Sequence, residues 1–253
     1  MRLQLRTWPE VEAYLKDNTG IIIPIGSAEQ HGPTGFIGTD ALCPEIVADG
    51  VAAETGAMVA PTLSIGMAQH HLGFPGSITL RPTTLIAVIK DVVESLARNG
   101  FERFFFVNGH GGNIATASAA FSEIYAEASL GGAGANRPPI RCRMRNWFDS
   151  PGVEKIQDEE FGAANGSHAT AGEVSLTYFG YPEDGQRVSA EGKLSPEVAP
   201  TGTIYDADDY RNRFADGRIG SDPTLATEAI GERLRDAAVA DLAADYREFL
   251  AES

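Results

Sequence analysis

Residues 104–113 read Phe-Phe-Phe-Val-Asn-Gly-His-Gly-Gly-Asn, and this stretch decides the class of fold. Its first four residues form a short, continuously apolar run, which is typical of a strand buried on both faces of a parallel sheet. A glycine-rich turn ends the strand and leads into an alanine-rich segment, which we expect to be helical to residue 129. The stretch therefore predicts one strand–turn–helix unit of an α/β protein.

Extended and helical patterns alternate on both sides of this unit. A second buried strand is expected at 21–25, further extended runs at 57–65 and 140–148, and helices at 7–16, 82–98, 169–178 and 222–249. This alternation predicts a mostly parallel central sheet flanked by helices, within a single domain that spans residues 1–253. We expect a surface loop at 131–139, a loop-rich segment at 149–167 and irregular structure at 180–221, whose role stays open.

Composition and charge exclude several classes of protein. The formal net charge of -15, without any run of basic residues, argues against nucleic acid as a partner. No run approaches the roughly 18 apolar residues of a membrane helix, and no apolar stretch follows the first arginines. Cys43 and Cys142 are too few for a disulfide framework or a zinc knuckle. We therefore expect a cytoplasmic protein without membrane contact.

The chain has five histidines, and each lies in a turn or just beyond an extended run: His31, His70, His71, His110 and His168. In open α/β sheets, the residues that follow the carboxyl ends of the strands line the binding crevice. These imidazoles are therefore expected to converge in one place.

Carboxylates accompany the first of these histidines. Glu29 and His31 are two residues apart after a buried strand, so an extended backbone would direct both side chains to the same side, and Asp40 follows after a loop. Carboxylates and neutral imidazoles suit zinc, manganese or iron(II), and one carboxylate can bridge two ions. Each residue alone would more often be a cap or a satisfied hydrogen-bond partner, but together they predict a metal site.

Two other functions stay open at this point. The glycine turn at 109–113 could hold a phosphate, as in a nucleotide-binding oxidoreductase. Asn113 and His110 do not fit the glycine fingerprint of such sites. The chain could also be a metal-binding protein without catalysis.

Four segments resemble the motifs of the creatininase family of metal-dependent amidohydrolases. These are Glu29 to Pro33 with Thr39-Asp40 following, the turn at 108–113, the His-Leu-Gly-Phe-Pro-Gly-Ser run at 71–77, and His168-Ala169 with Glu173 and Ser175. The resemblance implies a three-layer α/β/α fold and two divalent metal ions per chain, either zinc, manganese or iron. It also implies a homohexamer built as a trimer of dimers, and a small-molecule amide as substrate.

Carried over residue by residue, the resemblance assigns the site. The metal ligands would be Glu29, His31, Asp40, His110 and Glu173, with Asp40 as the bridge. His168 would be the catalytic proton donor and acceptor. His71, Gly111 and Gly112 would contact the substrate, while the role of His70 stays open.

The chain also departs from the family pattern. Creatininases have a glutamate ligand where this chain has Gly112, so Glu173 is expected to replace it. They place a tryptophan shortly before the histidine of the fourth motif, whereas residues 164–167 include no aromatic. Creatinine is therefore not the expected substrate. We expect hydrolysis of a C–N amide bond, of the cyclic amide or formamide type, by a metal-activated water; the absence of a Gly-x-Ser-x-Gly elbow agrees with this.

Overall fold

The computed structural model describes residues 1–131, 139–189 and 194–252. Its sheet contains four parallel strands in the order β2-β1-β3-β4. They are β1 (Gly20–Ile25), β2 (Met58–Val59), β3 (Arg103–Asn108) and β4 (Arg141–Asn146). β1 pairs with β3 from Gly20↔Arg103 to Ile25↔Asn108, and the apolar runs of both strands are fully buried. The two predicted buried strands are thus confirmed as the centre of the sheet.

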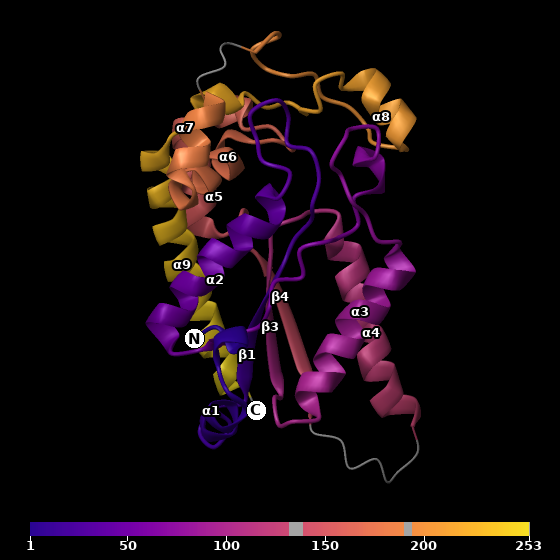
Figure 1. Ribbon diagram of the computed structural model, residues 1–253, viewed down its shortest axis with the longest axis vertical. Coiled ribbons are helices and arrows are strands. Elements are labelled where there is room, and N and C mark those ends of the chain that lie inside the picture. Colours follow the sequence, from indigo (N-terminus) through magenta and orange to yellow (C-terminus); the bar gives the residue numbers. More distant parts are fainter. Residues whose placement is uncertain (132–138, 190–193, 253) are drawn as a thin grey trace.

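Helices cover both faces of the sheet and make three layers (Figure 1). On one face, α2 (Thr39–Thr55) and α9 (Glu228–Ala251) pack on Ile22 and Phe105. On the other, α3 (Pro82–Ala97) and α4 (Asn113–Leu130) pack on Ile23 and Phe106. Successive strand residues point to opposite faces, so unbroken apolar runs supply both cores. The predicted three-layer α/β/α architecture is confirmed.

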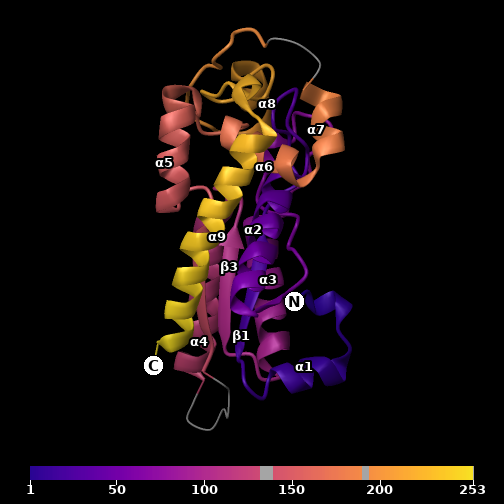
Figure 2. The same ribbon diagram turned by 90° about the vertical axis from the view of Figure 1, so that its left-hand side faces the viewer.

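The remaining helices gather at the two ends of the molecule. Beyond the carboxyl ends of the strands lie α5 (Pro151–Glu160), α6 (Ala171–Gly180), α7 (Pro182–Ser189) and α8 (Ala207–Arg213), and at the opposite end lies α1 (Trp8–Tyr14) (Figure 2). Short 3-10 turns occur at Leu3–Leu5, Gln69–His71, Gly162–Ala164 and Pro223–Leu225. Among the described residues, no helix combines the length and the apolar character that crossing a bilayer requires.

Three local predictions were wrong. Residues 149–167 were expected to be loop-rich but contain α5, whose start is marked by Pro151 in the first helical turn. The 180–221 region was expected to be irregular but contains α7 and α8; the Asp206 side chain accepts hydrogen bonds from two backbone N–H groups at the start of α8. The extended run at 57–65 is reduced to β2, because Pro61 cannot donate a ladder hydrogen bond. The loop expected at 131–139 falls almost wholly outside the described residues.

The helix α2 was not predicted at all. It is buried on several sides, between β1, α6 and α9, so apolar residues and alanines surround it instead of forming one stripe. Pro44 and Gly50 within it further weaken the helical signal. This omission matters because the first turn of α2 carries Asp40.

Candidate metal centre

Close backbone packing places Asp40 between the ends of the two central strands. Gly26 follows β1 and Gly109 follows β3, and a Cβ added to either glycine would lie 2.0 or 2.1 Å from the main-chain oxygen of Asp40. Pro44 has no N–H, so it cannot donate the usual helical hydrogen bond to that oxygen. The first turn of α2 can therefore touch both strand ends only because positions 26 and 109 lack side chains.

Two histidines flank the Asp40 carboxylate. His31 Nε2 lies 2.9 Å from Asp40 Oδ1, and His110 Nδ1 lies 2.9 Å from Asp40 Oδ2. His110 Nε2 is also 3.3 Å from Glu29 Oε2. All four side chains are buried. The structure thus brings together four of the five predicted ligands around one carboxylate.

The second nitrogen of each ring faces a backbone carbonyl. His31 Nδ1 donates to the carbonyl oxygen of Glu29 at 3.1 Å, and His110 Nε2 donates to that of Met67 at 2.8 Å. A carbonyl oxygen only accepts, so these nitrogens carry the protons. In the neutral rings the lone pairs are then on His31 Nε2 and His110 Nδ1, the atoms that face Asp40. Metal-binding histidines are oriented in this way in proteins.

The electrostatics of the cluster favour a cation. Burial lowers the pKa of His31, but the charge of Asp40 and its hydrogen bond outweigh burial and raise that pKa to about 10. Burial likewise lowers the pKa of His110, yet Glu29 and Asp40 raise it to about 9. Burial raises the pKa of the Glu29 and Glu173 carboxyl groups. The cluster therefore attracts positive charge to the positions between its carboxylates.

The donor atoms fit two divalent ions. One group of potential ligands is Glu29, Asp40 and His110, and a second is His31, Asp40 and Glu173; in each group the ligand atoms lie within 4.8 Å of one another. Both carboxylate oxygens of Glu29 and Oδ2 of Asp40 are buried and lie near histidine nitrogens, but none of these contacts within the described residues has the geometry of a full hydrogen bond. Buried, unsatisfied carboxylate oxygens are costly unless a cation compensates them. Asp40 is common to both groups, so it can lie between two ions.

Gln30, which the sequence reasoning did not single out, links two further histidines to the cluster. Its Oε1 accepts from the Gly32 N–H at 2.9 Å, which fixes the orientation of the amide. Its Nε2 then donates to Gly217 O and to His71 Nδ1, both at 2.9 Å. His71 consequently carries its proton on Nε2, 3.0 Å from Glu29 Oε1. Gln30 lies within the first motif, between two predicted ligands, and this position is the sequence signal that could have identified it as a site residue.

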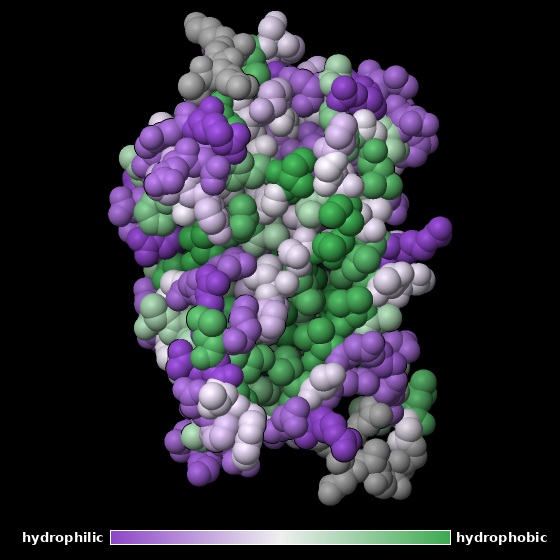
Figure 3. Space-filling view, in the orientation of Figure 1, coloured by the Kyte–Doolittle hydropathy of each residue, from purple (hydrophilic) through white to green (hydrophobic). Residues whose placement is uncertain are grey.

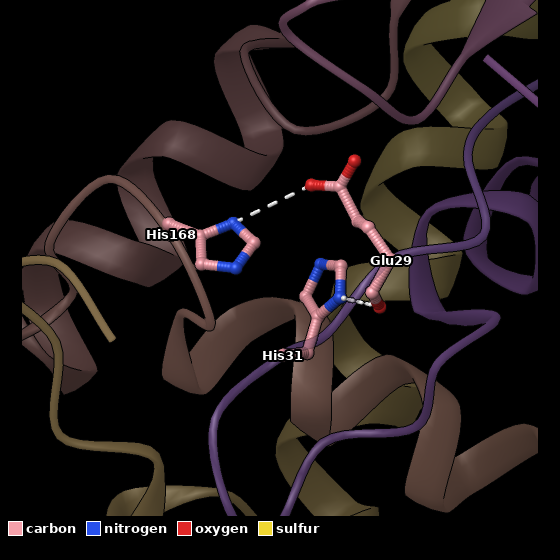
Figure 4. Close-up of side chains that lie close together, drawn as sticks. All are labelled: Glu29, His31 and His168. Atoms are coloured by element: carbon pink, nitrogen blue, oxygen red, sulfur yellow. Dashed lines mark hydrogen bonds and ion pairs between the residues drawn. The ribbon is translucent and has the colours of Figure 1, made fainter. Parts of the chain in front are cut away.

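His168 approaches the same carboxylate from another part of the chain. Its Nε2 donates to the main-chain oxygen of Gln30 at 2.7 Å, so its Nδ1 carries the lone pair and lies 3.7 Å from Glu29 Oε1. Figure 4 shows the His168 and His31 rings next to each other and beside the Glu29 side chain. Burial lowers the pKa of His168 well below its usual value, and the neighbouring His31 and His71 lower it further. Nδ1 is therefore a free proton acceptor near the cluster.

The backbone between His168 and Glu173 makes their side chains point in different directions. Ala169 has a φ of 53°, a left-handed conformation that is uncommon for a residue with a Cβ. α6 begins after it, and the Thr170 and Glu173 side chains form a capping box: Glu173 Oε2 accepts from Thr170 N at 2.9 Å. This agrees with the expectation that His168 precedes the first helical turn. Glu173 has a second role, because it also stabilises the start of α6.

A cavity of about 610 Å³ opens over the cluster. Glu29, Asp40, His110, His168 and Glu173 line one side of it, with His70, His71, Gly111 and Gly112. The predicted substrate-contacting residues therefore border the same space as the predicted ligands. The cavity is also lined by residues that were not singled out from the sequence: Phe148, Asp149, Glu154, Gln157, Asn165 and Ile204.

The sequence profile of the family described as "Creatininase: Creatinine amidohydrolase" matches residues 4–246. The chain belongs to the creatininase family. As a member of this family it is a metal-dependent hydrolase of C–N amide bonds. A nucleotide-binding oxidoreductase is not favoured, because His110 of the glycine turn faces Asp40 and Glu29.

Other creatininase-family proteins resemble the chain over most of its length. The creatinine amidohydrolase of Pseudomonas putida is 28% identical over 250 residues, which are 96% of this chain and 94% of the relative. The mycofactocin precursor peptide peptidase of Mycolicibacterium smegmatis is 28% identical over 85% of this chain and 78% of its own. A solved creatininase variant of the Zn-Zn type superposes with a TM-score of 0.83 at 24% identity, covering 99% of this chain and 98% of that one. This structural likeness confirms the creatininase fold.

Proposed function

We propose that the chain hydrolyses the C–N bond of a small cyclic amide or formamide with two divalent ions, either zinc, manganese or iron(II). Glu29, Asp40 and His110 would hold one ion, and His31, Asp40 and Glu173 the other. The observation that carries this proposal is the pair of ligand groups that share Asp40 beneath one cavity. The cavity volume lies within the usual range for small-molecule sites.

The chain's own residues supply the proton transfer. When bound, a divalent ion polarises the substrate carbonyl and makes a water molecule more acidic. His168 accepts a proton at Nδ1 and returns it to the departing nitrogen, while its Nε2–H stays bonded to the Gln30 carbonyl and holds the ring in place. His71, fixed by the Gln30 amide, borders the substrate space together with Gly111 and Gly112. No side-chain nucleophile is needed.

The residues that precede His168 in the sequence argue for a substrate other than creatinine. Residues 164–167 are Ala-Asn-Gly-Ser, and the last three line the cavity without providing a ring that could stack on a flat substrate. The identity of the substrate therefore depends on the other residues that line the cavity.

A screen of amides with the metal-loaded enzyme tests the proposal. We expect about two ions per chain by elemental analysis, and hydrolysis of at least one lactam or formamide. A chelator should stop the reaction, and zinc or manganese should restore it. Metal binding with every amide left intact would instead support a metal-binding protein without catalysis. A metal content near zero, without recovery on adding metal, would contradict the metal centre itself.

We also propose a homohexamer, arranged as a trimer of dimers. Figure 3 shows apolar side chains gathered over the middle of one face, and large apolar residues such as Leu5, Trp8 and Ile78 are exposed. Light scattering should give about 160 kDa for six chains of 26.9 kDa. A mass equal to one chain would contradict this.

Two further expectations from the sequence remain proposals: that residues 1–253 form one domain, and that the protein is cytoplasmic.

A further inference from the structure

Two carboxylates outside the ligand groups also line the cavity. Asp149 follows β4, and Glu154 lies in the first turn of α5; both side chains are exposed and border the cavity. Asp149 Oδ2 accepts a hydrogen bond from Asn146 Nδ2 at 2.6 Å. Glu154 makes no ion pair or side-chain hydrogen bond within the described residues. Among these residues, no lysine or arginine lines the cavity, so none neutralises Asp149 or Glu154 there.

A largely buried amide borders the same cavity. Gln157 is one turn further along α5, is only 9% exposed and borders the cavity. Its side chain makes no hydrogen bond to any other residue that the structure describes. A Cβ added to Gly172, in the first turn of α6, would lie 3.0 Å from Gln157 Nε2. The amide therefore lies against the turn that carries Glu173, with its hydrogen-bonding capacity unused. An unpartnered amide on a side chain that is largely buried but borders the cavity points to a ligand there.

The carboxylates that border the cavity fall into two groups: those expected to bind the metal ions and those that are not. If the proposed function holds, the carboxylates of Glu29, Asp40 and Glu173 are committed to the two ions. Asp149 and Glu154 are then left to interact with whatever enters the cavity. An anionic group there would meet two uncompensated negative charges, whereas a cation would be attracted to both.

We propose that Asp149, Glu154 and Gln157 form a subsite for a cationic, hydrogen-bond-donating group, such as an ammonium or guanidinium. The substrate would carry this group in addition to the amide that is cleaved. Phe148 and Ile204 border the same cavity and would contact the carbon chain between the two groups. This inference rests on the proposed function, because it specifies the substrate class of the same site.

Pairs of amides that differ only in one amine test the subsite. N-(4-aminobutyl)formamide is compared with N-butylformamide, and α-amino-ε-caprolactam with ε-caprolactam. Binding to the metal-loaded enzyme is measured by calorimetry at pH 7, and kcat/KM is measured in parallel. In at least one pair we expect the cationic member to bind on the order of tenfold more tightly at low ionic strength, with a smaller preference in salt.

Isosteric variants separate this subsite from the general acidity of the protein. The double variant Asp149→Asn, Glu154→Gln should reduce the preference to about onefold without weakening the neutral amide. Gln157→Leu should weaken the cationic member more than the neutral one. Asp158→Asn removes one negative charge from an exposed position of α5 outside the cavity, and it should leave the preference unchanged.

The outcomes distinguish this inference from the proposed function. Equal affinities within both pairs, undetectable binding of both cationic amides, or a preference that survives the double variant would overturn the subsite. Turnover without any preference would overturn the subsite and leave the hydrolase intact. A preference in binding without turnover of either amide would support the subsite and contradict the proposed reaction.

Discussion

Asp40→Ala is expected to lose both metal ions, because Asp40 belongs to both ligand groups and its two oxygens face different histidines. Elemental analysis should show a fall from about two ions per chain to near zero, with turnover at the background rate. Near-normal metal content in this variant would show that the two groups do not share a ligand.

Variants of Glu173 provide the matched comparison, because Glu173 belongs to only one of the two groups. Glu173→Gln should lower the metal content by about one ion while the amide oxygen still accepts the Thr170 N–H bond. Glu173→Ala should lose the same ion and also about 1 kcal/mol of stability, since it removes half of the capping box. Thermal unfolding of the two variants without metal separates the capping role from the ligand role.

His168→Ala is expected to retain both ions and to reduce kcat by a factor on the order of 10² to 10⁴, the usual scale for losing a general acid or base. The reason is geometric: Nδ1 lies 3.7 Å from Glu29 Oε1, and Nε2 is fixed by the Gln30 carbonyl. Metal analysis and steady-state kinetics on one preparation check both parts of this prediction.

One structural alternative makes that experiment informative. Ligand atoms of Glu29, His31 and His168 also lie within 4.8 Å of one another, so His168 could itself be a ligand. Loss of one ion from His168→Ala would show that it is. Unchanged turnover with both ions present would show that the proton is transferred by another group.

The parts of the fold that the sequence predicts are those with local signals. The runs at 21–25 and 104–107 are buried on both faces, and nothing but a central parallel strand suits such runs. Glu29 and His31 are predictable because metal-binding residue types lie two positions apart just after a buried strand, although the structure ends that strand at Ile25. By contrast, α2 has no amphipathic pattern, since the protein surrounds it.

The parts of the site that escaped prediction depend on contacts between distant segments. Gln30 reaches Gly217 across 187 residues through its side-chain amide and His168 across 138 through its main-chain oxygen, and no spacing rule would reveal such contacts of a neutral residue. Gln157 was placed in a loop because the start of α5 was not recognised. Glu154, in the first turn of the same helix, was missed for the same reason.

The contact of Gly26 and Gly109 with the Asp40 carbonyl also bears on how this protein can evolve. Any side chain at either position would displace the start of α2 and move Asp40 away from both histidines. The position of the metal-binding residues therefore depends on close main-chain contacts, and substitutions at these two glycines are poorly tolerated. Glu154 of α5 and Ile204 also border the cavity but are exposed, so they can change without disturbing the metal centre. Substitutions of such exposed residues can therefore bring new substrates during evolution, while the metal centre and its hydrolytic chemistry stay the same.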